Sequence, residues 1–391
     1  MSRSPAIVQA ARGPELSPLD IAAGQAYGEI PVEIPPATLP PLRALELSLA
    51  RALERPPCVV AFSGGRDSSV ILCVAARVAR EEGLDAPIAV THRFRDVPAT
   101  FEDEWQELVL RHAAVSEWVR LEHGAELDMV GPVAARVMEE HGRFFPAGIH
   151  AWQPLFEQAR GGTLVNGMEG DVLFGAWWWA GLGDLRARRR RPRPRDLLTA
   201  LHAHAPDPLA RAAGRRRNPS PSLPWLTETA RRRMSALRER HLVRQPVRFD
   251  AYVRWAVSRR VVQLTRRELD RLAAGAGASN LHPFQDPAFL AGLAAAGGRD
   301  GFGDRTATTR HLFGGDLPDA VVARPAKVLF DGAFLNDHSR ALAPAWDGQG
   351  FDPELVRAEV LREEWRRPVL PTRTALLLQD LWLRRRAERT T

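Results

Sequence analysis

The sequence has very little cysteine and no long apolar run. Only two cysteines, Cys58 and Cys73, occur among its 391 residues, which excludes a disulfide framework and a four-cysteine zinc site. Both lie on apolar runs, near 57–62 and 70–76, that are too short to span a bilayer, so we expect core thiols. The N-terminal residues lack the apolar core of a signal peptide. Because 45% hydrophobic and 26% charged residues are typical of globular proteins, we expect a cytoplasmic protein of up to two domains with no membrane partner.

Lysine is nearly absent as well. Of the 54 basic residues, all are arginine except Lys327. A GC-rich genome would exchange lysine for arginine wherever any cation serves, but a compact ammonium and a planar guanidinium differ where geometry matters. Lys327 is therefore either a lysine retained by chance or a residue that the chemistry of the protein requires. The net charge of +7 is only a mild bias toward nucleic acid, anionic lipid or an acidic substrate.

Short apolar runs alternate with amphipathic stretches between about residues 58 and 180. The apolar runs predict strands at 58–62, 88–92, 117–122 and 163–167. The amphipathic stretches predict helices at 42–54, 68–82, 101–114, 127–140 and 150–160, and a further helical turn after Asp171. Strands that alternate with helices in this way predict βαβ units and a parallel sheet. The fold class is therefore α/β, with ligands expected at the carboxyl edge of the sheet.

Composition divides the chain into four segments. They are a proline-rich N-terminal extension (1–57), the α/β domain (58–185), an Arg/Pro-rich linker or loop (186–224) and a mostly helical domain (225–391). The arginine runs of the third segment are either solvated surface or an anion-binding site. The three tryptophans at 177–179 are expected to pack between the domains rather than to form a ligand cage.

A glycine- and serine-rich loop directly follows the first strand and opens the first long helix. Two adjacent glycines allow a tight turn whose N–H groups converge on an anion, the serines add hydroxyl donors, and the helix contributes its positive end. Asp67 would repel phosphate, unless it holds a Mg²⁺ ion that binds the phosphate oxygens. The spacing is neither Walker A nor a dinucleotide fingerprint, and a serine-capped helix after a glycine turn is the simpler alternative. The predicted ligand residues are Phe62, Ser63, Gly64, Gly65, Asp67, Ser68 and Ser69.

This loop, SGGRDSS, resembles the SGGxDS loop of N-type ATP pyrophosphatases, which cleave ATP between its α- and β-phosphates. Three later segments resemble one branch of that superfamily, the asparagine synthetases. NGMEGDVLFG at 166–175 is similar to SGEGxDExFGG, LHPFQD at 281–286 to RxPFLD, and LPDAVVARPAK at 317–327 to LPxxVxxRxK. The sequence is thus identified as similar to the synthetase domain of the asparagine synthetase family, over roughly 40–345.

The resemblance implies a PP-loop domain that uses ATP and Mg²⁺. Asp67 and Asp171 would hold the metal, and Asn166 and Gly167 would lie beside the nucleotide. The lysine that ends the third segment, Lys327, would stabilise the transition state of adenylation, which gives a compact cation a specific use. The implied activity is that of a carbon–nitrogen ligase, which forms an acyl-adenylate, releases pyrophosphate and passes the acyl group to an amine.

Three departures from asparagine synthetase favour a different substrate. The sequence does not open with the glutaminase domain and its nucleophilic cysteine, Met168 stands where the synthetase has a glutamate, and an Arg-rich insert follows the site. Glu169 is adjacent, but one residue changes where a carboxylate points. The lasso-peptide cyclases are synthetase-like enzymes that join a side-chain carboxyl to a peptide amine. We therefore expect a small-molecule or peptide carboxylate and an amine as substrates, in peptide or secondary-metabolite macrolactam or amide formation.

Other functions stay open. An asparagine synthase proper would use aspartate and ammonia, with a separate glutaminase as partner, and a peptide carrier is the corresponding partner of a peptide ligase. A tRNA-modifying pyrophosphatase would suit the arginines, but no aromatic platform for single strands accompanies them. A non-enzymatic nucleotide-binding scaffold is the third alternative. His92 and His282 lie near the expected site, as structural donors or, for His92, as the base that accepts the amine's proton.

Overall fold

A five-stranded parallel sheet forms the centre of the protein. The computed structural model describes residues 16–203, 205–206, 208–211, 220–243, 245–324 and 333–389. Its strands are β1 (Cys58–Ala61), β2 (Ile88–Phe94), β3 (Trp118–His123), β4 (Thr163–Val165) and β5 (Ser279–Leu281). They lie in the order β3-β2-β1-β4-β5, and every pair is parallel. The α/β fold class and its first four strands are thus confirmed.

The fifth strand was not predicted: the sequence analysis expected a mostly helical domain after residue 225 and placed no strand in it. β5 pairs with β4 in the register Thr163↔Ser279 to Val165↔Leu281. A three-residue strand shows no period of two, and its residues are only half-buried or exposed, so no apolar pattern marks it. The sheet therefore joins sequence from both sides of the Arg/Pro-rich segment.

The sheet separates two hydrophobic cores. Successive side chains of β1 point to opposite faces, so Val60 packs with α3 (Pro41–Leu53) and α4 (Arg66–Glu82), whereas Val59 packs with the helices of the other face. That second face is covered by α6 (Pro132–His141), α7 (Gln153–Gln158) and α14 (Arg260–Ala276). Burial on both faces explains why β1 is apolar throughout rather than alternating.

The predicted helices are present, with shifts where proline intervenes. α4 and α5 (Asp103–Ala113) match their predicted ranges within two residues. The helix expected at 127–140 begins only at Pro132, because proline at the first helical position suits a start and not an interior. The stretch 150–160 is divided into η2 (Ile149–Trp152) and α7. Both cysteines are buried, which raises the pKa of each thiol to about 12 and confirms them as core thiols.

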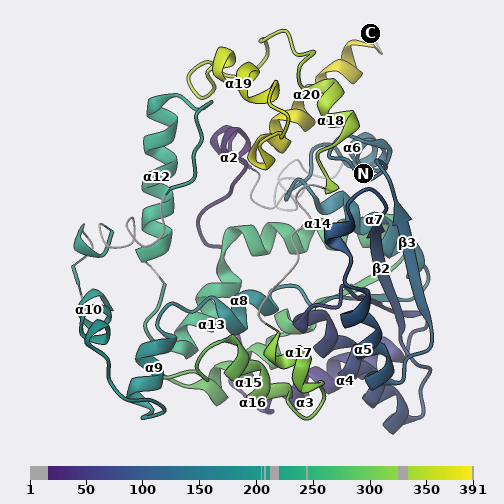
Figure 1. The fold of residues 1–391 in the computed structure, drawn as a ribbon, viewed down its shortest axis with the longest axis vertical. Coiled ribbons are helices and arrows are strands. Elements are labelled where there is room, and N and C mark those ends of the chain that lie inside the picture. Colours follow the sequence, from purple (N-terminus) through teal and green to yellow (C-terminus); the bar gives the residue numbers. More distant parts are fainter. Residues whose placement is uncertain are drawn as a thin grey trace, which may run out of the picture.

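Helices of the C-terminal half surround one end of this sheet. Within the Arg/Pro-rich segment the structure places a helix, α10, rather than a linker alone, and Figure 1 shows α9, α10 and α12 on the side of the molecule opposite β2 and β3. No helix of the described ranges is long and apolar enough to cross a membrane. The remaining elements are α2 (Pro18–Ala23), η1 (Pro98–Thr100), α8 (Gly170–Gly175), α9 (Ala180–Arg186), α10 (Pro194–Ala203), α12 (Glu228–Val243), α13 (Phe249–Ser258), η3 (Pro283–Gln285), α15 (Pro287–Gly297), α16 (Arg305–Phe313), α17 (Asp319–Ala323), α18 (Asp337–Leu342), α19 (Ala358–Trp365), η5 (Thr372–Thr374) and α20 (Ala375–Glu388).

Two of the three tryptophans join the two halves, as expected. The indole N–H of Trp177 donates to the carbonyl of Pro246 at 3.0 Å, and that of Trp179 to the carbonyl of Gln245 at 3.2 Å. Both side chains are buried. They therefore act in packing.

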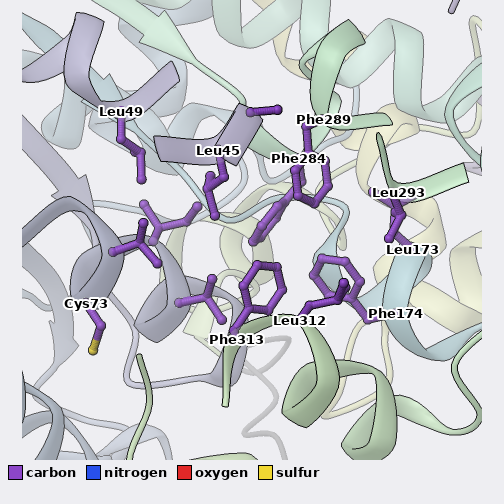
Figure 2. Packing of buried hydrophobic residues seen from close by; sticks show 14 of the residues in the cluster. Leu45, Leu49, Cys73, Leu173, Phe174, Phe284, Phe289, Leu293, Leu312 and Phe313 are labelled. Atoms are coloured by element: carbon purple, nitrogen blue, oxygen red, sulfur yellow. The ribbon is translucent and has the colours of Figure 1, made fainter. Parts of the chain in front are cut away.

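An aromatic cluster holds α8 from behind. Phe174 of α8 meets Phe284 of η3 and Phe313 of α16 edge-to-face, with ring centroids 5.0 and 5.6 Å apart (Figure 2). Such contacts add to the stabilisation from burial. Because Phe174 is three residues from Asp171, this cluster fixes the helix that carries a predicted metal ligand. The PFQD segment thus serves packing, and Asp286 caps α15 by accepting from the N–H groups of Ala288 and Phe289.

Phe284→Ala should lower the free energy of unfolding by about 3–5 kcal/mol, because Phe284 is fully buried and the cavity left behind cannot collapse. Urea denaturation measures the change. The matched control is Val369→Ala, whose side chain is 76% exposed and should cost less than about 0.5 kcal/mol. Equal losses in the two variants would contradict the role given to the cluster.

Candidate functional site

A cavity of about 690 Å³ opens at the carboxyl edge of the sheet, where parallel α/β folds bind ligands. Its wall combines the ends of β1 and β2, the glycine-rich loop, the segment after β4 and the start of α14. Of the predicted site residues, those that line it are Phe62, Ser63, Gly65, Asp67, Ser68, Gly167 and Asp171. Gly64, Ser69 and Asn166 lie behind the wall, and Lys327 lies outside the described residues.

The glycine-rich loop is folded by its own hydroxyl groups. The Ser68 Oγ donates to the carbonyl of Gly65 at 3.1 Å, and the backbone N–H of Ser63 points at the same Oγ at 3.3 Å. Gly64 has φ +79°, a conformation that favours glycine. α4 begins directly afterwards, with Gly65 as its N-cap and no side chain bonded there. No serine side chain caps α4, so the alternative of a serine-capped helix is wrong. Residues of its first turn, Arg66, Asp67 and Ser68, line the cavity, and the first N–H groups of a helix lack partners within it and can bind an anion.

Two glycines bring the segment after β4 against this loop. A Cβ atom added at Gly167 would lie 2.8 Å from the backbone carbonyl carbon of Asp67, and one at Gly170 would lie 2.5 Å from its Cγ. Only glycine allows such an approach. This close approach places Asp67 beside the segment that carries Asp171, and both carboxylates line the same cavity.

These carboxylates suit Mg²⁺ better than a metal held by protein alone. Among the residues that the structure describes, no group of three or more His, Cys, Asp or Glu side chains could hold a metal. Mg²⁺ commonly takes one or two carboxylates and completes its shell with water and phosphate oxygens. Asp67 and Asp171, in a cavity lined by an anion-binding loop, fit that pattern.

Arg305 is a site residue that the sequence analysis missed. It is the first residue of α16, lines the cavity, and donates from Nη2 to Asp67 Oδ2 at 2.7 Å. Its aliphatic stem lies on Gly175, where a Cβ would be 3.0 Å away. One arginine among so many carries no distinguishing signal in the sequence. Its guanidinium can balance negative charge next to the loop.

A buried ion pair attaches α5 and the end of α17 to the loop. Arg324 and Glu102 form a bond through Arg324 Nη2 and Glu102 Oε1, and their side chains are only 6% and 4% exposed. Arg324 Nη1 also donates to the carbonyl of Gly64 at 2.9 Å, while Gln106 Nε2 donates to the carbonyl of Ser63 at 3.2 Å. In return, Arg66 Nη2 donates to the carbonyl of Arg324 at 2.6 Å. The loop is thereby held from both sides.

Another buried charge holds the chain at the far side of residues 325–332. The carboxylate of Asp128, fully buried, accepts from the N–H of Asn336 at 2.7 Å and from Ser339 Oγ at 2.6 Å. Phe334 and Arg324, which flank residues 325–332, both line the cavity. The described chain on either side of Lys327 is thus anchored at the site.

Met168 and Glu169 both reach the cavity. Met168 is apolar and packs with the second core. Glu169 has φ +71°, which is uncommon for a residue with a side chain, and lies 3.4 Å from the guanidinium of Arg259. Burial raises the pKa of Glu169 to about 7, with Arg259 opposing the shift and Asp171 adding to it. Position 168 thus carries no carboxylate, and the neighbouring carboxylate of Glu169 is paired with Arg259.

The histidines near the site are structural donors. His92 lies against the carbonyl of Ala151 at 2.9 Å through Nε2 and against His123 at 2.8 Å through Nδ1. Burial lowers the pKa of His92 to about 3, so the ring is neutral and both nitrogens are engaged. His282 binds Asn166 at 3.2 Å, and Asn166 in turn donates to the carbonyl of Leu281 in β5. Asn166 thus ties β4 to β5 from behind the cavity.

The chain matches a known protein family over most of its length. The family model described as asparagine synthase covers residues 42–384, which is most of the chain. No match was found among curated proteins. The matched range includes the glycine-rich loop, both aspartates, Arg305, the Arg324–Glu102 pair and Lys327.

Gly167→Ala should weaken the binding of ATP, which the family resemblance implies as ligand, because the new methyl group would press on the backbone of Asp67 and displace the loop. Isothermal titration with ATP and Mg²⁺ measures the affinity, and we expect a loss of at least about tenfold. The matched control is Gly315→Ala, at a glycine with open space around its Cβ position. An unchanged affinity in Gly167→Ala would exclude the close approach as a requirement for binding.

Glu102→Gln should destabilise the fold by about 3–5 kcal/mol, because the charge of Arg324 would stay buried without its partner. Glu228→Gln, in an exposed pair on α12, is the control and should leave the stability almost unchanged. The double variant Glu102→Leu/Arg324→Leu should recover much of the stability but still bind ATP weakly, since Gly64 loses its donor. Thermal denaturation and ATP titration measure the two effects, and a double variant that binds normally would show that the pair serves stability alone.

Proposed function

The chain belongs to the asparagine synthase family of ATP-dependent carbon–nitrogen ligases, and we propose that it adenylates a carboxylate and transfers the acyl group to an amine. The observation that supports this most directly is the shared cavity wall. It joins the anion-binding loop, Asp67 and Asp171 through the glycine contacts at 167 and 170. Such a wall suits a triphosphate with a bound divalent cation.

In the first step a carboxylate oxygen of the substrate attacks the α-phosphorus of ATP. The bond from that phosphorus to the bridging oxygen breaks, and pyrophosphate leaves with the electron pair. First-turn N–H groups of α4 and the hydroxyls of Ser63 and Ser68 would hold the β- and γ-phosphates. Arg305, now paired with Asp67, would turn to the leaving pyrophosphate. Mg²⁺, held by Asp67 and Asp171, would neutralise charge on the phosphate oxygens.

Lys327 has the role of the transition-state cation in this proposal. Its support is the sequence match, its uniqueness among 54 basic residues, and the cavity position of Arg324 and Phe334 on either side. A compact ammonium can approach the charge that develops at the α-phosphate. In the second step the amine attacks the acyl carbon, AMP leaves with the electron pair of the C–O bond, and the amine nitrogen gives one proton to solvent water.

The carboxylate substrate is larger and less polar than aspartate in this proposal. Met168 replaces a carboxylate at the cavity with an apolar group, and further apolar side chains line the same cavity: Trp152, Leu155, Val261 and Val262. A peptide or a secondary metabolite, joined in a macrolactam or amide, fits such a lining. The cofactors are ATP and Mg²⁺, and a peptide carrier is the partner that this substrate favours.

An asparagine synthase proper is the second candidate, and Glu169 is the observation that favours it. This carboxylate lies in the cavity beside Arg259, so it could meet a small charged substrate. A separate glutaminase would then supply ammonia.

Lys327→Arg should lower the rate of pyrophosphate release by about a hundredfold or more, because the planar guanidinium cannot take the place of the ammonium. Asp171→Asn should lower the rate and raise the Mg²⁺ concentration needed for half-maximal activity, because the metal loses one of its two carboxylate ligands; Asp319→Asn, at an exposed position, serves as control. Pyrophosphate and phosphate are measured separately, with aspartate plus ammonium and with peptides that carry an Asp or Glu side chain and a free amine. Turnover with peptides supports the proposal, turnover with aspartate supports the second candidate, and phosphate instead of pyrophosphate would overturn both.

A further inference from the structure

α10 presents apolar side chains to solvent. Leu197, Leu198 and Leu201 of this helix are 67%, 70% and 60% exposed, and Leu209, in the helical turn at 208–211, is 63% exposed. Only two other large apolar side chains of the described ranges are exposed, on α12 and near the C-terminus. The exposed leucines are thus concentrated on one element, and such patches mark interaction sites on folded proteins.

The leucines of α10 lie on its outer face. Leu197 and Leu201 are one turn apart with Leu198 beside them, so the three share a face. The inner side of the helix is mixed: Asp196 is 8% exposed, His202 packs on the ring of Trp179 with centroids 5.4 Å apart, and Ala200 and Ala203 pack against the first hydrophobic core. The helix is therefore attached to the protein by small and polar side chains, while its largest apolar side chains stay in water, where covering them would be favourable.

This face is held in place before any partner arrives. Arg190 makes two bonds of 2.7 Å to the carboxylate of Asp196 and donates to the carbonyl of Gly181 in α9 at 2.9 Å. The start of α10 is therefore fixed to α9. A preformed surface loses little conformational entropy on binding.

Free cations lie at one end of the leucine row. Arg188, Arg191 and Arg193 precede α10 and are exposed, and no ion pair of the described chain includes them. The two carboxylates nearby are already used, Asp184 by Arg189 and Asp196 by Arg190. Within the part of the chain that the structure describes, no carboxylate pairs with these three arginines, and their positive charge adds to the positive N-terminal end of α10.

We propose that this surface, formed by Arg188, Arg191, Arg193, Leu197, Leu198, Leu201 and Leu209, docks an acidic amphipathic helix of a separate partner protein. The row of leucines on one short helix is an exposed ridge, which matches the apolar face of one further helix, as in helix-on-helix packing. The cations require carboxylates at one end of that partner helix. A second copy of this chain would bring the same exposed arginines instead of carboxylates to this surface. A lipid surface is disfavoured because the three arginines all precede the leucines in the sequence rather than lying on both sides of them.

The test uses a fluorescently labelled synthetic helix with leucines at i, i+3, i+4 and i+7 and a cluster of glutamates at one end. The measurement is fluorescence anisotropy with the full chain. The same peptide with lysines in place of the glutamates is the charge control. We expect only the acidic peptide to bind, and a dissociation constant weaker than about 100 μM would overturn the proposal.

Two triple variants test the surface itself. Leu197→Ser/Leu198→Ser/Leu201→Ser and Arg188→Gln/Arg191→Gln/Arg193→Gln should each weaken binding by about tenfold or more. The matched controls are Leu237→Ser/Val369→Ser and Arg233→Gln/Arg240→Gln/Arg267→Gln, which remove exposed leucine, valine and arginine elsewhere and should leave it unchanged. Equal effects of surface and control variants would overturn the proposal.

The competing occupants give different results. Sedimentation of the chain with phosphatidylserine vesicles, anisotropy with a labelled single-stranded RNA, and analytical ultracentrifugation of the chain alone test lipid, nucleic acid and self-association. If any of these interactions is lost in the leucine variant while the acidic peptide fails to bind, the surface has another occupant and the proposal is wrong. All variants are surface substitutions, and unchanged circular dichroism spectra would show that they fold.

Discussion

The buried pair of Arg324 and Glu102 is the interaction on which the site depends. A pair of charges removed from water is costly unless its remaining hydrogen-bonding groups are satisfied, and here the guanidinium also binds the carbonyl of Gly64. One arginine thus connects α5, the glycine-rich loop and the chain that leads to Lys327. An apolar pair of the same size could fill the space with equal stability, but it could not orient the loop. The buried ion pair therefore serves to position the loop.

Packing behind the cavity fixes the other elements of the site, as the Arg324–Glu102 pair fixes the loop. The aromatic cluster around Phe284 fixes α8, the amide of Asn166 fixes β4 against β5, and Gly167 lets the segment between them touch the loop. None of these residues supplies chemistry. Together they set how far apart Asp67 and Asp171 lie, since a shift of either backbone would move a carboxylate away from the cavity.

The sequence predicts most of the fold for clear physical reasons. β1 to β4 are apolar runs bounded by turns, and the glycine-rich loop has a chemistry that few other loops share. β5 could not be found, because three half-exposed residues carry no periodicity. Arg305 and Arg324 could not be distinguished from the other arginines, because their importance arises from burial and partners that only the fold assigns. For Lys327 the opposite holds. It stands out in the sequence as the one lysine among 54 basic residues, whereas it lies outside the residues that the structure describes.

β5 has a consequence for how the chain can fold on the ribosome. It is an edge strand that comes from far beyond the first four, so the edge of β4 stays unpaired until residue 281 has been synthesised. An unpaired edge exposes backbone N–H and C=O groups to other chains. A fragment that ended within the Arg/Pro-rich segment would keep that open edge and lose α14 and α15, which cover the two faces of the sheet. The shared sheet and cores thus join the α/β part and the helical part, and we expect the two to fold as one cooperative unit rather than as separate modules.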